Sequence, residues 1–278
     1  MYVLLVKIKF LSGFMLLPPH VIQSSGYPAP SPTTLVGALA FPYIKLMEYP
    51  ELESNYSTAK YLLDQVVYAS FWAPPYITHL DTVRGFTLTW QRHERLRNLS
   101  KIIVCIEKNI DCKKAEEAKD SAYGPLSMPI TVYEGPAYIA YVVKDKDLVR
   151  YAYGIVRIGM KESLVAAEKM WLFDLRSIVV SNIESVETRF YVPARLVNSC
   201  NRCDTYKMPT LNPQNYSSLA IQDYVSEEDG SKVYEVFYVP RNIDNMQVKP
   251  KEGETLTLRL QADNEELMLI VPKQGVME

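Results

Sequence analysis

The sequence is short of the residues from which most metal and nucleophile sites are built. Its 278 residues include only four cysteines and three histidines. The histidines, His20, His79 and His93, lie in no HExxH-type metal motif. The chain also has no Walker-type phosphate loop and no nucleophile elbow. These absences argue against the common metal-dependent and nucleophilic classes of enzyme.

The chain also lacks a surplus of positive charge and any long apolar run. Its 30 Lys and Arg stand against 32 Asp and Glu, so the net charge is -2, and a nucleic acid would bind at a local basic patch. No stretch reaches the roughly 18 apolar residues that a membrane span needs. The N-terminal alternation, which includes Lys7 and Lys9, is typical of a strand and not of a signal peptide. We expect a soluble, cytoplasmic protein with no membrane partner.

The four cysteines, Cys105, Cys112, Cys200 and Cys203, are too few for a disulfide scaffold. Cys200 and Cys203 have the spacing of half a zinc site, and the other half would have to come from Cys105 and Cys112 or from a histidine. Free thiols or a redox-labile pair are the simpler interpretation. We expect neither a metal nor another cofactor.

Over its first half the chain alternates between strand and helix patterns. Alternating apolar residues predict a strand over 2–12. A proline-rich loop then leads to a helix, for which Ser31 suits the N-cap and which Pro42 is expected to end. Apolar residues at helical spacing predict a second helix around 57–70.

A strand–helix–strand pattern follows later in the chain. The apolar, β-rich run 137–143 predicts a strand. Asp145 or Asp147 is expected to cap a helix that runs to about Ile158, and 164–175 is expected to return as a strand. The order strand, helix, strand, strand, helix, strand is that of the ferredoxin-like or RRM-like fold.

We therefore predict an α+β protein with two domains. Residues 1–176 form a ferredoxin-like (RRM-like) domain with a long β-hairpin or thumb insertion at about 85–133. Residues 177–278 form a mostly β domain, because short β-type runs at 178–183, 187–192, 233–239, 255–260 and 266–271 are separated by turn residues and no long helix pattern appears.

The insertion concentrates positive charge. Residues 84–101 carry five basic residues and one acid, and five minus one gives a local charge of +4. Cations neutralise phosphates and aromatic faces stack on bases, so this mixture suits single-stranded RNA. An ordinary solvated hairpin is the alternative. The candidate RNA-binding residues are Arg84, Trp90, Arg92, His93, Arg95, Arg97 and Lys101.

A second candidate is the segment 157–163, which follows the later helix. Gly159 lets a backbone approach closely, and Arg157 and Lys161 with exposed amides suit a phosphate. The alternative is a helix C-terminus that Gly159 caps and basic residues complement, and the local pattern favours it.

A third candidate is the helix start within 26–37. Free N–H groups and the helix dipole at such a start suit a phosphate, with Tyr27, Ser31 and Thr33 beside it. A proline-stiffened connection with a normal N-cap is the alternative.

Three segments together resemble the fifth family of CRISPR-associated proteins, in the RAMP superfamily. The segment 27–39 (YPAPSPTTLVGAL) is similar to the N-terminal signature of that family. The segment 157–165 (RIGMKESLV) resembles its glycine-containing loop after the second helix, although the family often has Ser where this chain has Met160. The segment 190–196 (FYVPARL) resembles its entry into the C-terminal domain. Within that family, the sequence most resembles the archaeal type I-A members.

The resemblance implies a non-catalytic subunit of a type I CRISPR effector complex, Cascade. Such a subunit caps the 5′ handle of the crRNA and contacts the backbone RAMP subunit and the large subunit. It meets target DNA only through the assembled complex. The resemblance also implies RNA contacts from the three candidate segments above.

Two other functions compete with this one. A metal-independent endoribonuclease needs only a general base and a positioned cation, and His93 lies in the basic segment; in one subtype the family member itself cleaves precursor crRNA. We expect no catalysis, because that subtype's catalytic set does not map onto His20, His79 or His93. A scaffold that contacts only proteins is the third option.

Overall fold

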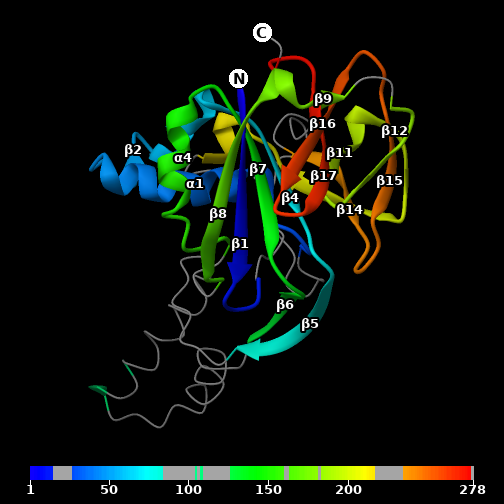
Figure 1. Ribbon diagram of the computed structural model, residues 1–278. Helices are drawn as coiled ribbons and strands as arrows, with labels where there is room; N and C mark the ends of the chain where they lie inside the picture. The colour runs from blue at the N-terminus through cyan, green and yellow to red at the C-terminus, as the bar shows by residue number, and fades with distance from the viewer. Residues whose placement is uncertain are drawn as a thin grey trace.

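The computed structural model describes residues 1–14, 27–83, 104, 107–108, 126–159, 163–180, 183–216 and 234–276. Over these residues the chain is an α+β protein made mostly of strands, as predicted (Figure 1). None of the described helices is long and apolar enough to cross a membrane.

A four-stranded antiparallel sheet forms the centre of the molecule. Its strands, in spatial order, are β4 (Val66–Trp72), β7 (Ala137–Val143), β1 (Tyr2–Phe10) and β8 (Val165–Asp174). β1 pairs with both β7 and β8, and β7 also pairs with β4. The strands predicted at the N-terminus, at 137–143 and at 164–175 are confirmed.

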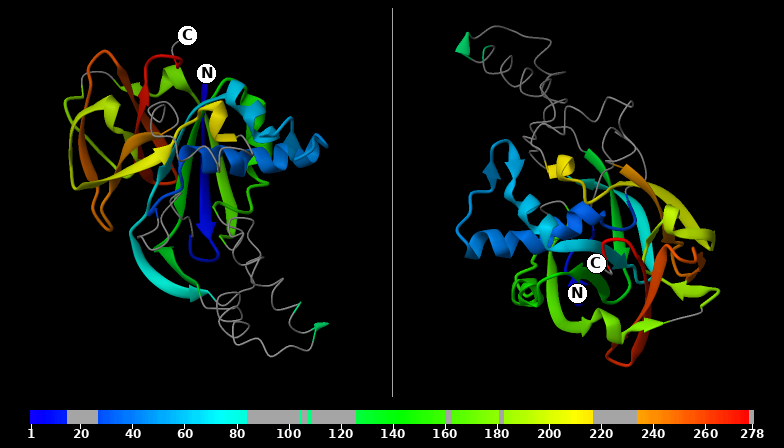
Figure 2. Two further views of the ribbon diagram at one scale, coloured as in Figure 1. Left: turned by 180° about the vertical axis from the view of Figure 1, so that it is seen from behind. Right: turned by 90° about the horizontal axis from the view of Figure 1, so that it is seen from above.

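Both faces of this sheet are buried. On one face Leu4, Val6 and Ile8 of β1 join a core that includes residues of helix α1 (Pro32–Leu46). On the other face Val3 and Leu5 join a core with the hairpin of β16 (Thr255–Ala262) and β17 (Glu265–Pro272). The views in Figure 2 show the helix and this hairpin on opposite sides of the sheet. Residues before and after 176 therefore share a core, and a boundary between two domains there stays a prediction.

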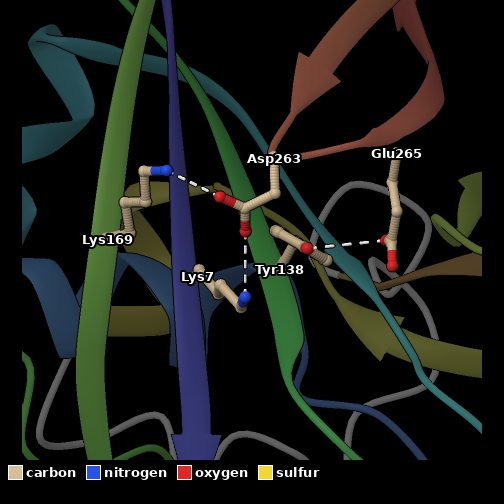
Figure 3. Close-up of polar contacts among 5 residues, drawn as sticks. All are labelled: Lys7, Tyr138, Lys169, Asp263 and Glu265. Carbon is tan, nitrogen blue, oxygen red and sulfur yellow. Dashed lines mark hydrogen bonds and ion pairs between the residues drawn. The ribbon is translucent and has the colours of Figure 1, made fainter.

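The turn of the β16–β17 hairpin is fixed to the sheet by ion pairs (Figure 3). Asp263 lies in this turn with a left-handed φ of 51°, and its carboxylate is 2.9 Å from Lys7 Nζ and 2.6 Å from Lys169 Nζ. Lys7 and Lys169 are directly opposite each other in the β1–β8 register. Like charges in that position repel, so the carboxylate offsets their repulsion. Hydrogen bonds from Lys169 and then Lys7 lower the pKa of Asp263.

Helix α1 begins as predicted and ends later than predicted. The Ser31 side chain accepts from the Thr34 N–H as the N-cap. The prediction that Pro42 ends the helix is wrong, because α1 continues to Leu46 with Pro42 inside it. Pro42 is buried and packs against Gly154, where any Cβ would collide with the proline ring. Burial of the ring compensates for the hydrogen bond that a proline cannot donate.

The helix predicted at 57–70 is wrong. The chain forms a 3₁₀ helix, Thr58–Asp64, and then enters strand β4 at Val66. Ala59 and Leu62 are buried, as a helical stripe would require. The β-branched Val66 pairs with Val143 of β7, because sheet pairing overrides a weak helical pattern.

The helix predicted to run to Ile158 is much shorter. Asp145 accepts from the Asp147 N–H and caps a 3₁₀ turn, Lys146–Leu148, which leads into α4 (Val149–Ala152). Gly159 has a φ of 93° but lies in a later turn, so its predicted role as the helix C-cap is wrong.

The insertion between β4 and β7 starts and ends as a two-stranded ribbon. β5 (Tyr76–Val83) pairs with β6 (Leu126–Tyr133) from Tyr76↔Tyr133 to Val83↔Leu126. The ribbon extends away from the sheets in Figure 1. Most of 84–125, including the charged turn expected at 112–119, lies outside the described residues.

The C-terminal part is built of short strands, as predicted. Two three-stranded sheets have the orders β10-β15-β12 and β11-β14-β13, and β9 extends the β16–β17 hairpin. The predicted runs each overlap a strand, whereas β12, β13 and β15 had no predicted counterpart. The bounds are β9 Val179–Val180, β10 Val186–Thr188, β11 Val192–Pro193, β12 Val197–Asn201, β13 Cys203–Pro209, β14 Tyr234–Pro240 and β15 Met246–Pro250.

Cys200 and Cys203 form a disulfide across the turn between β12 and β13. This pairing agrees with the redox-labile alternative and takes both thiols away from zinc. Within the described ranges no three His, Cys, Asp or Glu side chains cluster as metal ligands would.

Arg189 ties three separate segments together from a buried position. Its side chain is 4% exposed. The guanidinium donates to the backbone carbonyls of Ala73, of Asn242 at 2.6 Å and of Asp244 at 2.7 Å. It also lies 5.9 Å from the centre of the Trp72 ring, so it joins the end of β4 to the β14–β15 loop.

Candidate nucleic-acid interface

Two of the predicted segments, more than 100 residues apart in sequence, line one cavity of about 480 Å³. One wall is the exposed face of α1, and the other is the segment after α4 that leads into β8. Both walls belong to the part of the chain that the structure describes. The lining residues are Thr34, Gly37, Ala38, Phe41, Val156, Arg157, Gly159 and Leu164.

The second wall is held by backbone hydrogen bonds. The Ile158 N–H donates to the Ser163 carbonyl at 3.1 Å, and the Val165 N–H donates to the Val156 carbonyl at 3.0 Å. The Leu164 carbonyl accepts from the Leu11 N–H at 2.9 Å, just beyond the end of β1. The described residues of this wall, 156–159 and 163–165, are therefore paired with each other and attached to the central sheet, and we call this pair of segments the 156–164 hairpin. Gly159 lies at a position whose positive φ favours glycine.

The cavity combines apolar surface with one cation. Phe41, Val156 and Leu164 are large apolar side chains that are exposed, and Arg157 is exposed beside them. Lys45 is the main cause of a lowered pKa at Glu51, and the positive charge of Arg157 adds a smaller lowering. An aromatic and aliphatic wall suits a base, and a guanidinium suits a phosphate.

At the start of α1, two of the predicted binding residues are buried and hydrogen-bonded within the protein. Tyr27 is 6% exposed, and its hydroxyl donates to the Lys207 carbonyl at 2.6 Å. Ser31 is buried, and its hydroxyl lies 3.0 Å from that of Thr33. Thr33 is partly exposed. The burial of Tyr27 and Ser31 leaves a ligand no route to their side chains in this structure, so at this end Thr33 and Thr34 are the accessible positions.

Buried tyrosines hold the chain that leads into α1. The Tyr133 hydroxyl donates to the Pro28 carbonyl at 2.6 Å, and the Tyr141 hydroxyl donates to the Leu35 carbonyl at 2.8 Å. Burial raises the pKa of both phenols, which keeps them protonated as donors. The groove wall formed by α1 is thereby anchored to the β6 ribbon and to β7.

The remaining predicted residues fall on segments without a described position. Arg157, Gly159, Thr33, Tyr27 and Ser31 are the candidates that the structure describes. The others lie outside the described residues: Arg84, Trp90, Arg92, His93, Arg95, Arg97, Lys101 and Lys161. Of the histidines, His79 is exposed on β5 opposite Ile130, and His20 and His93 lie outside the described ranges.

Sequence reasoning missed most of the apolar half of the groove. Thr34, Gly37, Ala38 and Phe41 recur at i, i+3, i+4 and i+7 and so lie on one helix face. This stripe of small residues ending in an aromatic was a readable signal. Val156 and Leu164 carried no such signal, because Val156 fell within the predicted longer helix and Leu164 within the predicted strand 164–175.

The comparisons with known proteins show similarity to CRISPR-associated proteins. No family model matches the chain. A CRISPR-associated protein from Saccharolobus solfataricus, Cas5 3, is 25% identical over 190 residues, which cover 67% of this chain and 70% of the relative. Cas5 1, an aCascade subunit of the same organism, is 23% identical over 187 residues with the same coverage. The chain is similar to Cas5-type CRISPR-associated proteins.

The fold also has a solved counterpart. The crystal structure of a CRISPR protein from Archaeoglobus fulgidus matches it with a TM-score of 0.52 at 16% identity. The match covers 96% of this chain and 99% of that one. The likeness of fold therefore extends from the central sheet through the C-terminal strands.

Proposed function

We propose that this protein is a Cas5-type, non-catalytic, RNA-binding subunit of a type I CRISPR effector complex. In this proposal it caps the 5′ handle of the crRNA and bridges the backbone RAMP subunit and the large subunit of Cascade. The groove between α1 and the 156–164 hairpin carries the proposal, because it unites two segments that the family resemblance had marked separately as RNA contacts. The name of one relative, an aCascade subunit, supports assembly into such a complex.

The arrangement of the central sheet supports a ferredoxin-like domain. The order β4-β7-β1-β8 corresponds to second, third, first and fourth strand, as that fold requires. RRM domains bind RNA on the open face of this sheet. Here β16 and β17 cover that face, so RNA is expected at the groove by α1 and along the β5–β6 ribbon, which we interpret as the stem of the thumb.

The chemistry of binding follows from the lining of the groove. A base stacks on Phe41 or lies against Leu164, and the neighbouring phosphate pairs with Arg157. The turn at Gly159 lets the sugar–phosphate backbone approach without a side chain in the way. The basic residues predicted in 84–101 neutralise further phosphates of the same strand.

The groove is tested by Arg157→Ala, with Arg150→Ala as the matched control. Arg150 is exposed on α4 and already paired with Asp147 at 3.0 Å. Binding of a repeat-derived handle RNA is measured as a function of salt. We expect Arg157→Ala to weaken binding and to lower the log–log salt slope by roughly 0.7, the value for one phosphate contact with a single strand. Equal affinities and slopes for the two variants would remove Arg157 from the RNA site.

The insertion needs its own test. Replacement of Arg92, Arg95 and Arg97 by Ala is expected to lower the slope by up to about 2, since each lost phosphate contact contributes roughly 0.7. An unchanged slope would assign these arginines to a different role.

Absence of catalysis is tested by incubating the protein with repeat RNA in EDTA. We expect the RNA to remain intact. A single discrete cut that is lost in His79→Ala or His93→Ala would establish the endoribonuclease instead.

A further inference from the structure

The segment 45–55 projects from the body at the C-terminal end of α1. Every residue in it is exposed. It contains β2 (Leu52–Glu53), which pairs with β3 (Tyr56–Ser57) in a small hairpin. Figures 1 and 2 show this end of α1 and the hairpin extending beyond the central sheet, away from the C-terminal strands. We refer to residues 45–55 as the knob.

The knob exposes large apolar side chains in an unusual concentration. Leu46 is 70% exposed and Leu52 is 60% exposed, and Met47 and Tyr49 are exposed beside them. Single exposed apolar residues are common on soluble proteins, whereas a contiguous group of this kind marks an interaction site. Aromatic and Met side chains are also enriched in the buried cores of protein interfaces.

The knob has a defined shape before any partner binds. The Tyr49 N–H donates to the Ile44 carbonyl at 3.0 Å, and Lys45 pairs with Glu51 at 2.8 Å. Thr58 donates from its hydroxyl to the Pro50 carbonyl at 2.7 Å. The Tyr49 ring lies 6.0 Å from that of Tyr61, in an edge contact. Such preorganisation lowers the entropic cost of binding.

The charge of the knob limits what can bind to it. Glu48, Glu51 and Glu53 alternate with the apolar residues, and Lys45 is the single base, so one minus three gives a net charge of -2. Phosphate backbones and anionic lipid headgroups are repelled by this pattern. Two knobs facing each other in a symmetric dimer would bring like charges together. A complementary surface therefore combines an apolar socket with Lys or Arg at its rim.

We infer that the knob is a docking surface for a protein partner whose face has an apolar socket edged by basic residues. The knob begins in the last two residues of α1, but none of its residues lines the groove proposed to hold RNA, and the interface does not depend on RNA capping. Leu46 and Leu52 supply the buried contact, and Glu48 and Glu53 supply the complementary charge.

Site-specific photo-crosslinking tests the contact in the assembled complex. A benzoylphenylalanine is placed at the position of Leu46 or Leu52 in a tagged chain, and the complex is purified from its native host. Ile243, which is 74% exposed in the β14–β15 loop, provides the control position. We expect both knob positions to crosslink to one protein, at a peptide in which apolar residues are flanked by Lys or Arg, and position 243 not to crosslink there. Crosslinks to RNA or to a second copy of the chain, or no crosslink, would overturn the inference.

Charge reversal tests the complementarity. Two double variants are made: one combines Glu48→Lys with Glu53→Lys, and the other combines Leu46→Ser with Leu52→Ser. Each is expected to reduce co-purification of the crosslinked protein at least tenfold. The control, Ile243→Ser, is expected to leave co-purification unchanged. Handle-RNA binding by the isolated variants is measured in parallel and should stay at the wild-type value, which also reports that they fold. If the knob variants still co-purify with the crosslinked protein, the knob interface is refuted. If RNA binding is lost in Arg157→Ala but not in the knob variants, that result bears on the groove and not on the knob.

Discussion

Arg189 offers the sharpest test of how separate segments of this protein are held together. The proposed change is Arg189→Met, which keeps an apolar stem of similar length and removes the guanidinium. Three backbone carbonyls, those of Ala73, Asn242 and Asp244, then lose their donor at once. None of these acceptors sits in a regular ladder that would supply another donor.

The expected cost follows from these three contacts. A hydrogen bond to a charged donor contributes about 1.5–3 kcal/mol, and the desolvation that lowers the pKa of Arg189 offsets part of that sum. Loss of the Trp72 contact adds about 0.5–1 kcal/mol. We therefore expect the free energy of unfolding to fall by about 3–5 kcal/mol. For a chain of this length that corresponds to a Tm lower by about 5–8 °C.

Urea denaturation followed by circular dichroism measures the effect, with calorimetry for the Tm. Arg241→Met is the matched control, since Arg241 is 58% exposed and pairs with Asp204 on the surface; it should cost less than about 1 kcal/mol. Arg189→Lys should lie between wild type and Arg189→Met, because an ammonium reaches fewer of the three carbonyls. If Arg189→Met matched the Arg241→Met control, the reasoning from buried carbonyls would be refuted.

Three further predictions concern the sheet and its cover. Gly154→Ala should destabilise the protein by about 1–3 kcal/mol in the same urea assay, because its Cβ would collide with the Pro42 ring. Gly37→Ala is the control and should not destabilise the protein, because a Cβ at Gly37 meets nothing within 4 Å and alanine favours a helix. Asp263→Asn should speed amide exchange in β16 and β17, and 1 M salt should reduce the difference from wild type. The lowered pKa of Asp263 means that its stabilisation is present above the ordinary carboxyl pKa and is lost as pH falls through the lowered value. Wild type and Asp263→Asn should therefore converge in stability as the pH is lowered through that range. A constant difference would disprove the linkage.

Strands were predictable where a segment is buried throughout and its composition favours β structure. The run 137–143 is buried at every position, and its β-rich composition fixed its bounds from sequence. Ser31 was equally informative, since a serine before proline and an apolar stripe marks a helix start. Helix lengths were not predictable. Pro42 is tolerated because Gly154 makes room for its ring, and that contact joins residues 112 positions apart in the chain.

The sequence carried signals for each wall of the groove separately, but not for the contact between the two walls. Arg157 and Gly159 were identified from a local pattern, and the face of α1 had a readable stripe that ends at Phe41. Nothing in the sequence stated that these segments would meet, because the meeting depends on the way β8 and the end of β1 hold the 156–164 hairpin. The wrong helix at 57–70 has the same origin, since the pairing of Val66 with Val143 is a tertiary contact.

The long reach of Asp263 to Lys7, 256 residues back along the chain, has a consequence for biosynthesis. β1 is synthesised long before the hairpin that shields one side of its sheet. Until that hairpin has been made, the nascent sheet presents Val3 and Leu5 to solvent or to a chaperone. Contacts of such high sequence separation slow folding and prolong the interval in which the chain can aggregate. Delayed or truncated synthesis is therefore expected to harm this subunit more than a protein whose sheets are completed by neighbouring strands.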